Sequence, residues 1–532
     1  MLKYRRGPHR GRAALTQGEH HAMAVGTHET VAINHPTAKP TANIPCSIVI
    51  FGGAGALSHR KLLPALYNLA LDGELPEHCP IVAFSMEELD DERYRAWARD
   101  GIEKFSRRAV DPALWEKLGQ RIHFVRGRFT ERADYDGLRA RLEEVDRKYA
   151  TGGNHIYYFA IPPSFIENCA AMLHEAGLIR PPDGDQHFTR VVIEKPIGYD
   201  LASAMAIDDR VSMHFDESQI FRIDHYLGKE TVENLMVLRF ANAIFEPLWT
   251  SRFVDHVQLT VAEDEGVGTR ASYYEHAGAL RDMVQSHILG VLSIIAMEPP
   301  RSTRARAVRD SKLDVLRSIR PFGDEDIEKF TVRGQYGAGL VAGAAAPAYR
   351  DEENVAPDSR TETFVAMRCW IDNWRWAGVP FYIRTGKRMP KRTSEIAIYF
   401  KSVPRILYNA NPRAQLAPNM LTIRIQPDEG LSVHIISKVP GAQVRLQQVA
   451  VDFHYASTTP EAYETLLRDV ILGDQTLFMR RDAVEASWSL VDPIIAAWAE
   501  SPADPPLYAA GSWGPIEAAL MMAADGRAWR AL

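Results

Sequence analysis

The sequence predicts an α/β protein with a doubly wound, parallel-sheet N-terminal domain and an α+β C-terminal domain containing a large, mainly antiparallel sheet. Three observations lead to this prediction. With 532 residues, the chain is too long for one hydrophobic core. Short apolar runs alternate with helical patterns in its first part, as in parallel βαβ units. Beyond about residue 245, apolar and polar residues alternate with a period of two, as in antiparallel sheets with one wetter face.

Composition narrows the function classes. Hydrophobic residues make up 46% and charged residues 24% of the chain, which is ordinary for a globular protein. The formal net charge of −6 disfavours nucleic acid or an anionic membrane as a partner. The 4 cysteines are widely spaced and form no CxxC pair, so we expect no disulfide scaffold and no metal site, and a reducing, cytoplasmic location. No run of 18 apolar residues occurs, so no transmembrane helix is expected.

The first domain is expected over residues 45–222. Residues 1–44 have an Arg-rich, acid-poor start without apolar periodicity, and they predict a disordered extension, with a transit peptide as the alternative. Helical spacing of leucines after residue 58 is interrupted by Pro64, which implies a kink or a late helix start. Apolar runs predict strands over 47–51, 81–84, 156–161 and 191–193, and helices are expected over 87–99 and 166–176.

The second domain is expected over residues 223–532. A long helix is predicted over 277–297, and the stretch 337–358, rich in Gly, Ala and Pro, is interpreted as a loop. Period-two alternation predicts strands over 254–261, 395–400, 421–426 and 431–437.

A glycine-rich turn follows the first predicted strand. It has the form Gly52-x-x-Gly55-x-Leu57, and helical spacing follows it. A strand, a glycine turn and a helix together place backbone N–H groups against a pyrophosphate. Glycine turns also serve packing alone, but the position after the first strand of an α/β unit favours a Rossmann-like dinucleotide site.

The segment around this turn, IVIFGGAGALSHRKLLPALYNLA, resembles the start of the glucose-6-phosphate dehydrogenases. The resemblance implies oxidation of glucose 6-phosphate at C1 to 6-phosphogluconolactone, with hydride transfer to NADP or NAD, as the first step of the oxidative pentose phosphate pathway. It continues in family order through YYFAIPPSFI, VVIEKPIG, FRIDHYLGKETVENLMVLRFAN, ALRDMVQSHILGVLSIIAMEPP, VRGQY, RTGKRMP and WGP.

Oxidation of a C1 hydroxyl needs a base that takes the O–H proton while hydride leaves C1. The resemblance implies that His287 is this base and that Asp224 orients it. Without the resemblance, a lone histidine on the apolar stripe of helix 277–297 would be a core residue, and Asp224 would be a helix N-cap. Desolvation by that stripe would help to keep the imidazole neutral.

The resemblance also assigns the binding residues. His225, Tyr226 and Lys229, just before an apolar-periodic helix, would hold the 6-phosphate, where cations and a helix start favour an anion. The remaining substrate contacts would come from Lys195, Glu263, Asp282, Lys387 and Arg392, with Gln426 as a weaker candidate. The cofactor would be held by Gly52, Gly55, Leu57, Lys61, Tyr158 and Lys195.

The sequence departs from the family pattern where the cofactor binds. Ala56 and Ala83 replace the usual Asp and Gly, and Met86 stands where the family has the arginine for the 2′-phosphate of NADP. Glu87 and Glu88 follow Met86, and acidic groups near the ribose favour NAD. We therefore expect NADP with weakened selectivity, so that NAD can also serve, unless a cation near the glycine turn compensates.

Two alternatives remain beside this function. One is a catalytically inactive homologue that binds nucleotide or sugar phosphate, and the other is a broader hexose-phosphate dehydrogenase that prefers NAD. The chain keeps both His287 and Asp224, and an inactive homologue would have no reason to retain the base together with its partner. The resemblance further implies a homodimer or homotetramer assembled through the second domain's sheet.

Overall fold

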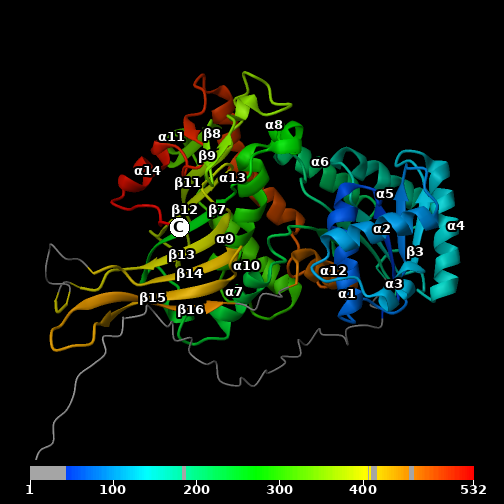
Figure 1. Cartoon of the computed structure of the whole chain (residues 1–532), viewed down its shortest axis with the longest axis horizontal. Coiled ribbons are helices and arrows are strands. Elements are labelled where there is room, and N and C mark those ends of the chain that lie inside the picture. The colour runs from blue at the N-terminus through cyan, green and yellow to red at the C-terminus, as the bar shows by residue number, and fades with distance from the viewer. Residues whose placement is uncertain (1–43, 183–186, 405, 409–415, 455–459) are drawn as a thin grey trace, which may run out of the picture. The chain divides into compact units, whose positions relative to one another are not determined.

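The computed structural model of the chain describes residues 44–182, 187–404, 406–408, 416–454 and 460–532. The expected extension over residues 1–44 thus lies outside the described residues, except for Ile44. The described part contains a six-stranded sheet, a nine-stranded sheet and a small two-stranded sheet (Figure 1). The two large sheets correspond to the two fold classes that the sequence predicts.

The six-stranded sheet has the order β3-β2-β1-β4-β5-β6, and all its neighbouring strands are parallel. This arrangement confirms the predicted doubly wound sheet. The sequence patterns missed β3, where His and Arg interrupt the apolar run, and β6, which has three residues. The strands are β1 (Ser47–Phe51), β2 (Ile81–Ser85), β3 (Ile122–Arg126), β4 (His155–Phe159), β5 (Thr189–Ile193) and β6 (Ile220–Arg222).

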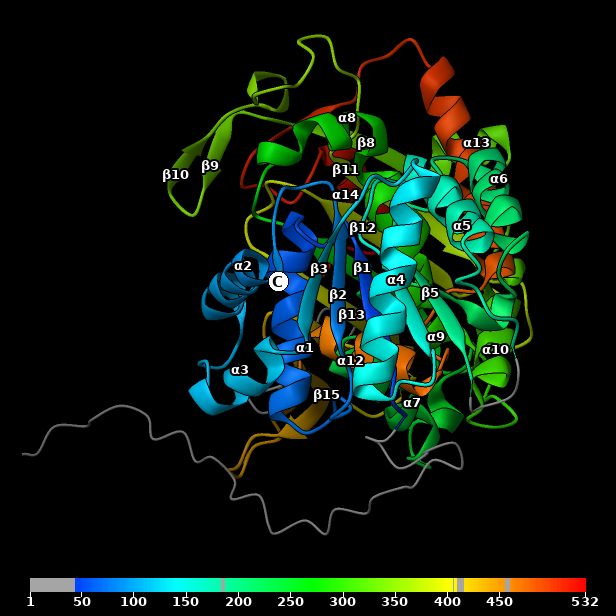
Figure 2. The ribbon, with the colours of Figure 1, turned by 90° about the vertical axis from the view of Figure 1, so that its right-hand side faces the viewer.

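Helices cover both faces of this sheet because successive strand residues point to opposite sides. In β1, Ile48 and Ile50 pack into a core with residues of α1 and α2, whereas Val49 and Phe51 pack with residues of α4 and α5. Figure 2 shows α4 in front of the parallel strands. The helices are α1 (Leu63–Leu71), α2 (Asp91–Phe105), α3 (Pro112–Gly119), α4 (Arg132–Tyr149), α5 (Ile166–Glu175) and α6 (Leu201–Ser212).

Two helix starts differ from the prediction. The helix expected over 87–99 begins at Asp91, because the side chain of Asp90 caps it by accepting a bond from the backbone N–H of Arg93. A π-helix, Ser58–Leu62, precedes α1, and Pro64 is the second residue of α1. Proline lacks an N–H donor, and here it lies where the π-helix gives way to the α-helix.

The nine-stranded sheet has the order β16-β15-β14-β13-β7-β12-β11-β8-β17 (Figure 1). Most neighbours are antiparallel, whereas β7 with β12 and β8 with β17 are parallel. The predicted mainly antiparallel sheet is confirmed. The strands are β7 (Val254–Ala262), β8 (Thr331–Gly337), β11 (Phe364–Trp370), β12 (Pro380–Gly386), β13 (Thr393–Phe400), β14 (Met420–Gln426), β15 (Gly430–Lys438), β16 (Leu446–His454) and β17 (Leu507–Ala509).

The helices of the second part also depart from the prediction in one place. The helix expected over 277–297 consists of the end of α8, a π-helix (Leu280–Ile288) and α9. The run Gly268–Ala296 is long and apolar enough to cross a membrane, but 89% of its most apolar window is buried within the protein. The helices are α7 (Glu230–Phe240), α8 (Ala271–Ala279), α9 (Leu289–Ala296), α10 (Ala305–Ser318), α11 (Asp324–Phe330), α12 (Ala462–Leu472), α13 (Arg481–Glu500) and α14 (Ile516–Ala523).

The interpretation of residues 337–358 as a loop is wrong in part. It contains a β-hairpin formed by β9 (Gly339–Val341) and β10 (Ala344–Ala346), which pair antiparallel. The two strands consist of a glycine, a leucine, a valine and three alanines, so no alternation of apolar and polar residues signals them. The backbone of Ala342 and Gly343 between them has positive φ and closes the turn. All four cysteines are buried and free of disulfides.

Candidate active site

One cavity of about 430 Å³ collects most of the predicted site residues. Its wall also includes Arg270, Met283, Glu429, Glu461 and Tyr463, which the sequence analysis did not single out. The predicted residues in the wall are Lys61, Lys195, His225, Tyr226, Lys229, Glu263, Asp282, His287, Arg392 and Gln426. The cavity is therefore where substrate chemistry is to be sought.

The π-helix explains how two of these side chains meet. Asp282 and His287 are five residues apart, and both belong to the π-helix Leu280–Ile288. Hydrogen bonds in a π-helix join residues five apart, so such residues lie over one another on one face. In an α-helix of 3.6 residues per turn the same two residues would point about 140° apart. The widened turn thus brings both side chains to the cavity.

His287 and Asp224 form a buried pair. Nδ1 of His287 lies 2.5 Å from Oδ1 of Asp224, and each side chain is 1% exposed. Asp224 also accepts a bond from the backbone N–H of Tyr226 at 2.9 Å. The other ring nitrogen, Nε2 of His287, has no hydrogen-bond partner among the residues that the structure describes. It is therefore available to a group in the cavity.

Burial and charge set the protonation of the pair. Burial lowers the pKa of His287, with Lys195 acting in the same direction and Asp224 opposing it. Burial raises the pKa of Asp224, but His287 and nearby cations outweigh it and leave a value of about 2. At neutral pH the carboxylate is therefore ionised and the imidazole neutral, with Nδ1–H donating to Asp224 and a free lone pair on Nε2.

One end of the cavity is cationic. Lys61, Lys229 and Arg392 lie in its wall, and burial together with Arg392 lowers the pKa of Lys229 to about 8. The Lys229 amine hydrogen-bonds Gln426 and lies 4.8 Å from the ring centre of Tyr226. Such a cluster of cations with a phenol suits an anionic group.

Acidic side chains held by lysines line another part of the cavity. Nζ of Lys195 donates to Oδ1 of Asp282 at 3.0 Å, and Lys387 donates to Oε2 of Glu263 at 2.7 Å. Burial raises the pKa of Asp282, but Lys195 and Lys387 more than offset this and hold it well below its usual range. Both carboxylates are positioned to accept from hydroxyl groups. Lys387 itself is not in the cavity wall. It contacts Glu263, which is in the wall.

The glycine turn has the tight geometry of a nucleotide-binding turn. Gly52 has φ +73°, and a Cβ there would lie 2.4 Å from the carbonyl oxygen of Ala160. The N–H of Gly55 donates back to the carbonyl of Gly52 at 2.8 Å, and the π-helix begins just after Leu57. Only a glycine fits at position 52, and the backbone is left open for a phosphate at a helix start.

Two predicted cofactor residues have other contacts. Tyr158 is fully buried, and its hydroxyl donates to Glu194 at 2.5 Å. Tyr463, which lines the cavity, donates to the same carboxylate at 3.2 Å. Lys61 lies in the cavity wall and pairs with Glu461 at 2.9 Å. The structure thus brings Lys61 to the substrate cavity and gives Tyr158 a supporting position.

Asp224, His225 and His287 offer ligand atoms that lie within 4.8 Å of one another, a spacing that could suit a metal ion. Nδ1 of His287 and Oδ1 of Asp224 are, however, hydrogen-bonded to each other. The absence of a metal remains a prediction from the sequence.

Comparisons with known proteins cover nearly all of the described chain. Two family models match: "Glucose-6-phosphate dehydrogenase, NAD binding domain" over residues 49–234 and "Glucose-6-phosphate dehydrogenase, C-terminal domain" over residues 236–530. The chain is 43% identical over 494 residues to the glucose-6-phosphate 1-dehydrogenase of Chlamydia muridarum, covering 91% of this chain and 97% of that one. It is 45% identical over 492 residues to that of Aggregatibacter actinomycetemcomitans, with the same coverage.

A solved structure gives the same picture. A glucose-6-phosphate dehydrogenase in complex with its substrate glucose 6-phosphate matches with a TM-score of 0.83 at 32% identity. The match covers 93% of this chain and 100% of that one. A glucose-6-phosphate 1-dehydrogenase from Mycobacterium avium matches with a TM-score of 0.77 at 34% identity, covering 92% of this chain and 99% of that one.

Proposed function

Since the chain belongs to the glucose-6-phosphate dehydrogenase family, we propose that His287 is the base of its reaction and Asp224 the group that orients this base. The chain has glucose-6-phosphate 1-dehydrogenase activity, the oxidation of glucose 6-phosphate to 6-phosphogluconolactone that begins the oxidative pentose phosphate pathway. One observation carries the assignment of the base. Nε2 of His287 is buried in the cavity wall without a partner among the described residues, while Nδ1 is bound to Asp224.

In the proposed mechanism, Nε2 of His287 accepts the proton of the C1 hydroxyl. The imidazolium that forms is stabilised by the ionised Asp224 on Nδ1. When bound, NAD(P) supplies the acceptor for the hydride that leaves C1. Because Asp224 keeps the ring in one tautomer, the lone pair of Nε2 is ready before the substrate arrives.

The substrate's two ends match the two parts of the cavity. We assign the 6-phosphate to the part of the wall that holds the cations, with His225, Tyr226 and Lys229 as its ligands and Arg392 and Lys61 beside them. Burial lowers the pKa of His225 well below its usual value, so His225 would act as a neutral donor. The sugar hydroxyls would be accepted by Asp282 and Glu263, whose charges Lys195 and Lys387 hold in place.

The pKa of Lys229 predicts a pH effect on substrate capture. Burial and Arg392 lower it to about 8, so the amine loses its proton, and the phosphate a cation, as the pH rises through that value. We expect kcat/KM for glucose 6-phosphate to fall above pH 8 and kcat to fall less, since a bound phosphate keeps the amine charged. In Lys229→Arg, whose guanidinium stays protonated, this basic limb should move to higher pH. An unmoved limb would assign it to another group.

The glycine turn fits a dinucleotide, because the Cβ that Gly52 lacks would fill the space beside Ala160. Gly52, Gly55 and Leu57 would hold the pyrophosphate there. At the end of β2, where the ribose binds in doubly wound sheets, Met86 is 56% exposed and the hydroxyl of Ser85 donates to the carboxylate of Glu87.

The cations that could hold a 2′-phosphate have other contacts. Nε2 of His59 lies 3.2 Å from Oδ2 of Asp100, Lys61 pairs with Glu461, and the guanidinium of Arg60 lies 5.3 Å from the ring centre of Phe105. Glu87, by contrast, could accept from the ribose hydroxyls. We therefore propose that NAD serves at least as well as NADP.

Initial rates with NADP and NAD test the coenzyme proposal. We expect kcat/KM for NAD to equal or exceed that for NADP. A Met86→Arg variant, which restores one charge-assisted hydrogen bond, should raise kcat/KM for NADP about tenfold. Met213→Arg, the same substitution at another exposed methionine, just after α6, should alter kcat/KM for neither coenzyme. A parent enzyme with a strong NADP preference would show that another cation reaches the 2′-phosphate.

The same assay tests the broader hexose-phosphate dehydrogenase when it also includes a second hexose 6-phosphate. Comparable kcat/KM for that sugar and for glucose 6-phosphate, together with a preference for NAD, would favour this alternative. We further propose a homodimer or homotetramer. The edge strand β16 supports this, since it exposes Val451 and Phe453 by 60% and 53%.

A further inference from the structure

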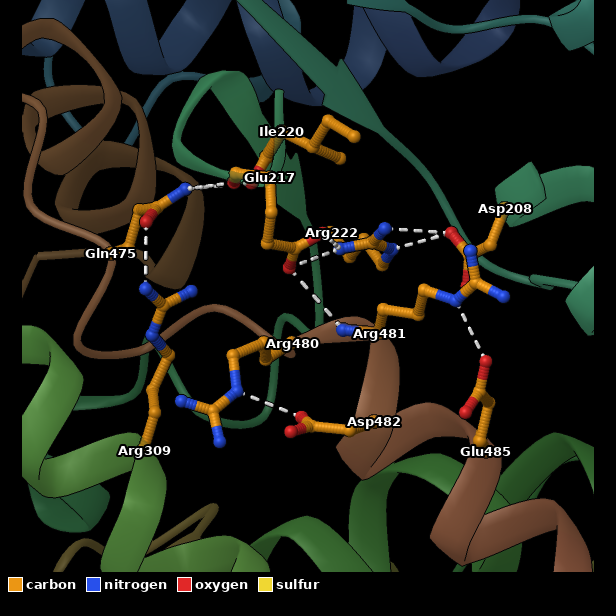
Figure 3. Close-up of polar contacts among 10 residues, drawn as sticks. All are labelled: Asp208, Glu217, Ile220, Arg222, Arg309, Gln475, Arg480, Arg481, Asp482 and Glu485. Carbon is orange, nitrogen blue, oxygen red and sulfur yellow. Dashed lines mark hydrogen bonds and ion pairs between the residues drawn. The ribbon is translucent and has the colours of Figure 1, made fainter. Parts of the chain in front are cut away.

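A group of charged side chains surrounds the buried Arg222 at the edge of the six-stranded sheet (Figure 3). Arg222, the last residue of β6, is 0% exposed. Its Nε donates to Oδ1 of Asp208 at 2.8 Å, and its Nη1 donates to both oxygens of Glu217 at 2.7 and 2.9 Å. Arg222, Asp208 and Glu217 are not among the described residues that form the wall of the substrate cavity. The substrate therefore gives no reason for a fully buried arginine here.

A second set of contacts fastens this edge to the segment between α12 and α13. The backbone N–H of Met479 donates to the carbonyl of Arg222 at 3.1 Å, as a neighbouring strand would. The side chain of Gln475 donates to the carbonyl of Ile220 at 2.8 Å and accepts from Arg309 of α10 at 2.7 Å. These bonds satisfy carbonyl groups of an edge strand that would otherwise lack partners.

The contacts continue onto α13. The backbone N–H of Arg481, the first residue of α13, donates to Glu217 at 3.3 Å (Figure 3). The side chain of Arg481 pairs with Asp209 of α6 at 2.7 Å. Further along, Trp488 of α13 donates to the carbonyl of Ile197 at 3.0 Å. Helix α13 also packs against the π-helix that carries His287. The segment that leads into α13 thus bonds to the end of β6, and α13 itself packs against the π-helix that carries the base.

Arg222 lies close in the chain to Asp224, so its contacts also affect the position of that carboxylate. Asp224 follows Arg222 by two residues, whereas its partner His287 lies on the π-helix. The distance between them depends on how the end of β6 is held against α13. Buried ion pairs seldom stabilise a fold more than apolar packing would. The contribution of Arg222 is therefore the fixed geometry that its forked guanidinium imposes on Asp208 and Glu217.

We propose that Arg222 is a positioning residue for the Asp224–His287 pair. With Asp208, Glu217 and the segment 475–481, it fixes the strand that delivers Asp224 against the helix that supports His287. The inference rests on the proposed role of His287 as the base. A displacement of about 1 Å at a reacting group can cost about 10²-fold in rate, so a small shift of β6 would be measurable.

Arg222→Lys tests the proposal, because it keeps the charge and removes the fork. We expect kcat to fall about tenfold or more, with KM for glucose 6-phosphate nearly unchanged. The acid limb of the pH profile of kcat/KM should also move to lower pH. The titratable groups that face His287 are Asp224, Asp282, Lys195, His225 and Tyr226. Of these, Asp224 is the one that would move away, and its loss removes an influence that raises the pKa of His287.

Two further variants keep the test decisive. Arg239→Lys is the matched control, since Arg239 is also 0% exposed and pairs with Glu246, away from β6; it should leave kcat and the pH limb unchanged. If Arg222→Lys does not fold, Gln475→Glu, which keeps the acceptor for Arg309 and removes the donor to the carbonyl of Ile220, should lower kcat in the same direction and shift the same limb.

The outcomes separate this inference from the proposed function. A His287→Asn variant that retains turnover would remove the base and with it the proposed function. An inactive His287→Asn together with an Arg222→Lys variant of parental kcat and parental pH profile would overturn the positioning role alone. Loss of thermal stability in Arg222→Lys without a change in kcat per folded enzyme would overturn it as well.

Discussion

Replacing His287 with Asn is expected to lower kcat by roughly 10²- to 10⁴-fold, the range that a positioned general base contributes. The amide of asparagine cannot take up the C1 proton, although it can still donate to Asp224. KM for glucose 6-phosphate should stay close to the parental value, since the cations Lys229 and Arg392 in the cavity wall are untouched. Steady-state kinetics of the variant with saturating coenzyme give both quantities.

A buried histidine outside the cavity provides the control. His256 is 6% exposed, and its Nδ1 lies 2.7 Å from Oδ2 of Asp255, so it forms a histidine–aspartate pair much like that of His287. His256→Asn should cost stability and leave kcat near the parental value. If both variants lost activity equally, damage to the fold rather than loss of the base would explain the effect at His287.

Lys229→Gln is expected to raise KM for glucose 6-phosphate by about 10- to 100-fold, because hydrogen bonds to charged groups contribute about 1.5–3 kcal/mol. The glutamine is of similar length but carries no charge, and kcat should change much less, since the amine takes no part in the proposed proton transfer. With free glucose, which has no phosphate, the variant and the parent should have similar kcat/KM. This substrate comparison separates phosphate recognition from general damage to the cavity.

Lys401→Gln is the control for this variant. Lys401 donates to the carbonyl of Ser251 at 2.6 Å and is not among the residues of the substrate cavity wall. Its replacement should leave KM for both sugars unchanged. A Lys229→Gln enzyme whose KM rises equally for glucose and for glucose 6-phosphate would contradict the assignment of Lys229 to the phosphate.

Much of the fold could be predicted because its strands carry strong local patterns. The runs at β1, β2, β4 and β5 are almost entirely apolar, and the glycine turn after β1 lies where a parallel sheet binds ligands. Strand β6 has no such pattern, because it is three residues long and ends on a buried arginine. The charge of Arg222 is paired with carboxylates from α6 and from the turn before β6. Tertiary contacts, not local sequence, determine that strand.

The candidate site shows the same division. The motifs named His287, Asp224 and the phosphate ligands, and the structure brings His287 and Asp224 together. Helical periodicity of 3.6 could not reveal that Asp282 and His287 share a face, because the π-helix that joins them has a different period.

Residues from distant parts of the chain were also beyond the sequence patterns. Tyr463 enters the cavity from α12 and shares Glu194 with Tyr158, and Lys61 reaches the cavity from the π-helix Ser58–Leu62 to meet Glu461. Pairs separated by hundreds of residues leave no local signal. Only Glu194 had one, as the acidic residue directly before Lys195 at the end of an apolar strand.

The central claim is that Nε2 of His287 takes the proton from the C1 hydroxyl. A crystal structure of the chain with glucose 6-phosphate bound tests it most directly. We expect Nε2 to lie within hydrogen-bonding distance of the C1 oxygen, about 2.6–3.2 Å, with Nδ1 still bound to Asp224. A C1 oxygen held by another side chain, with Nε2 out of reach, would contradict it.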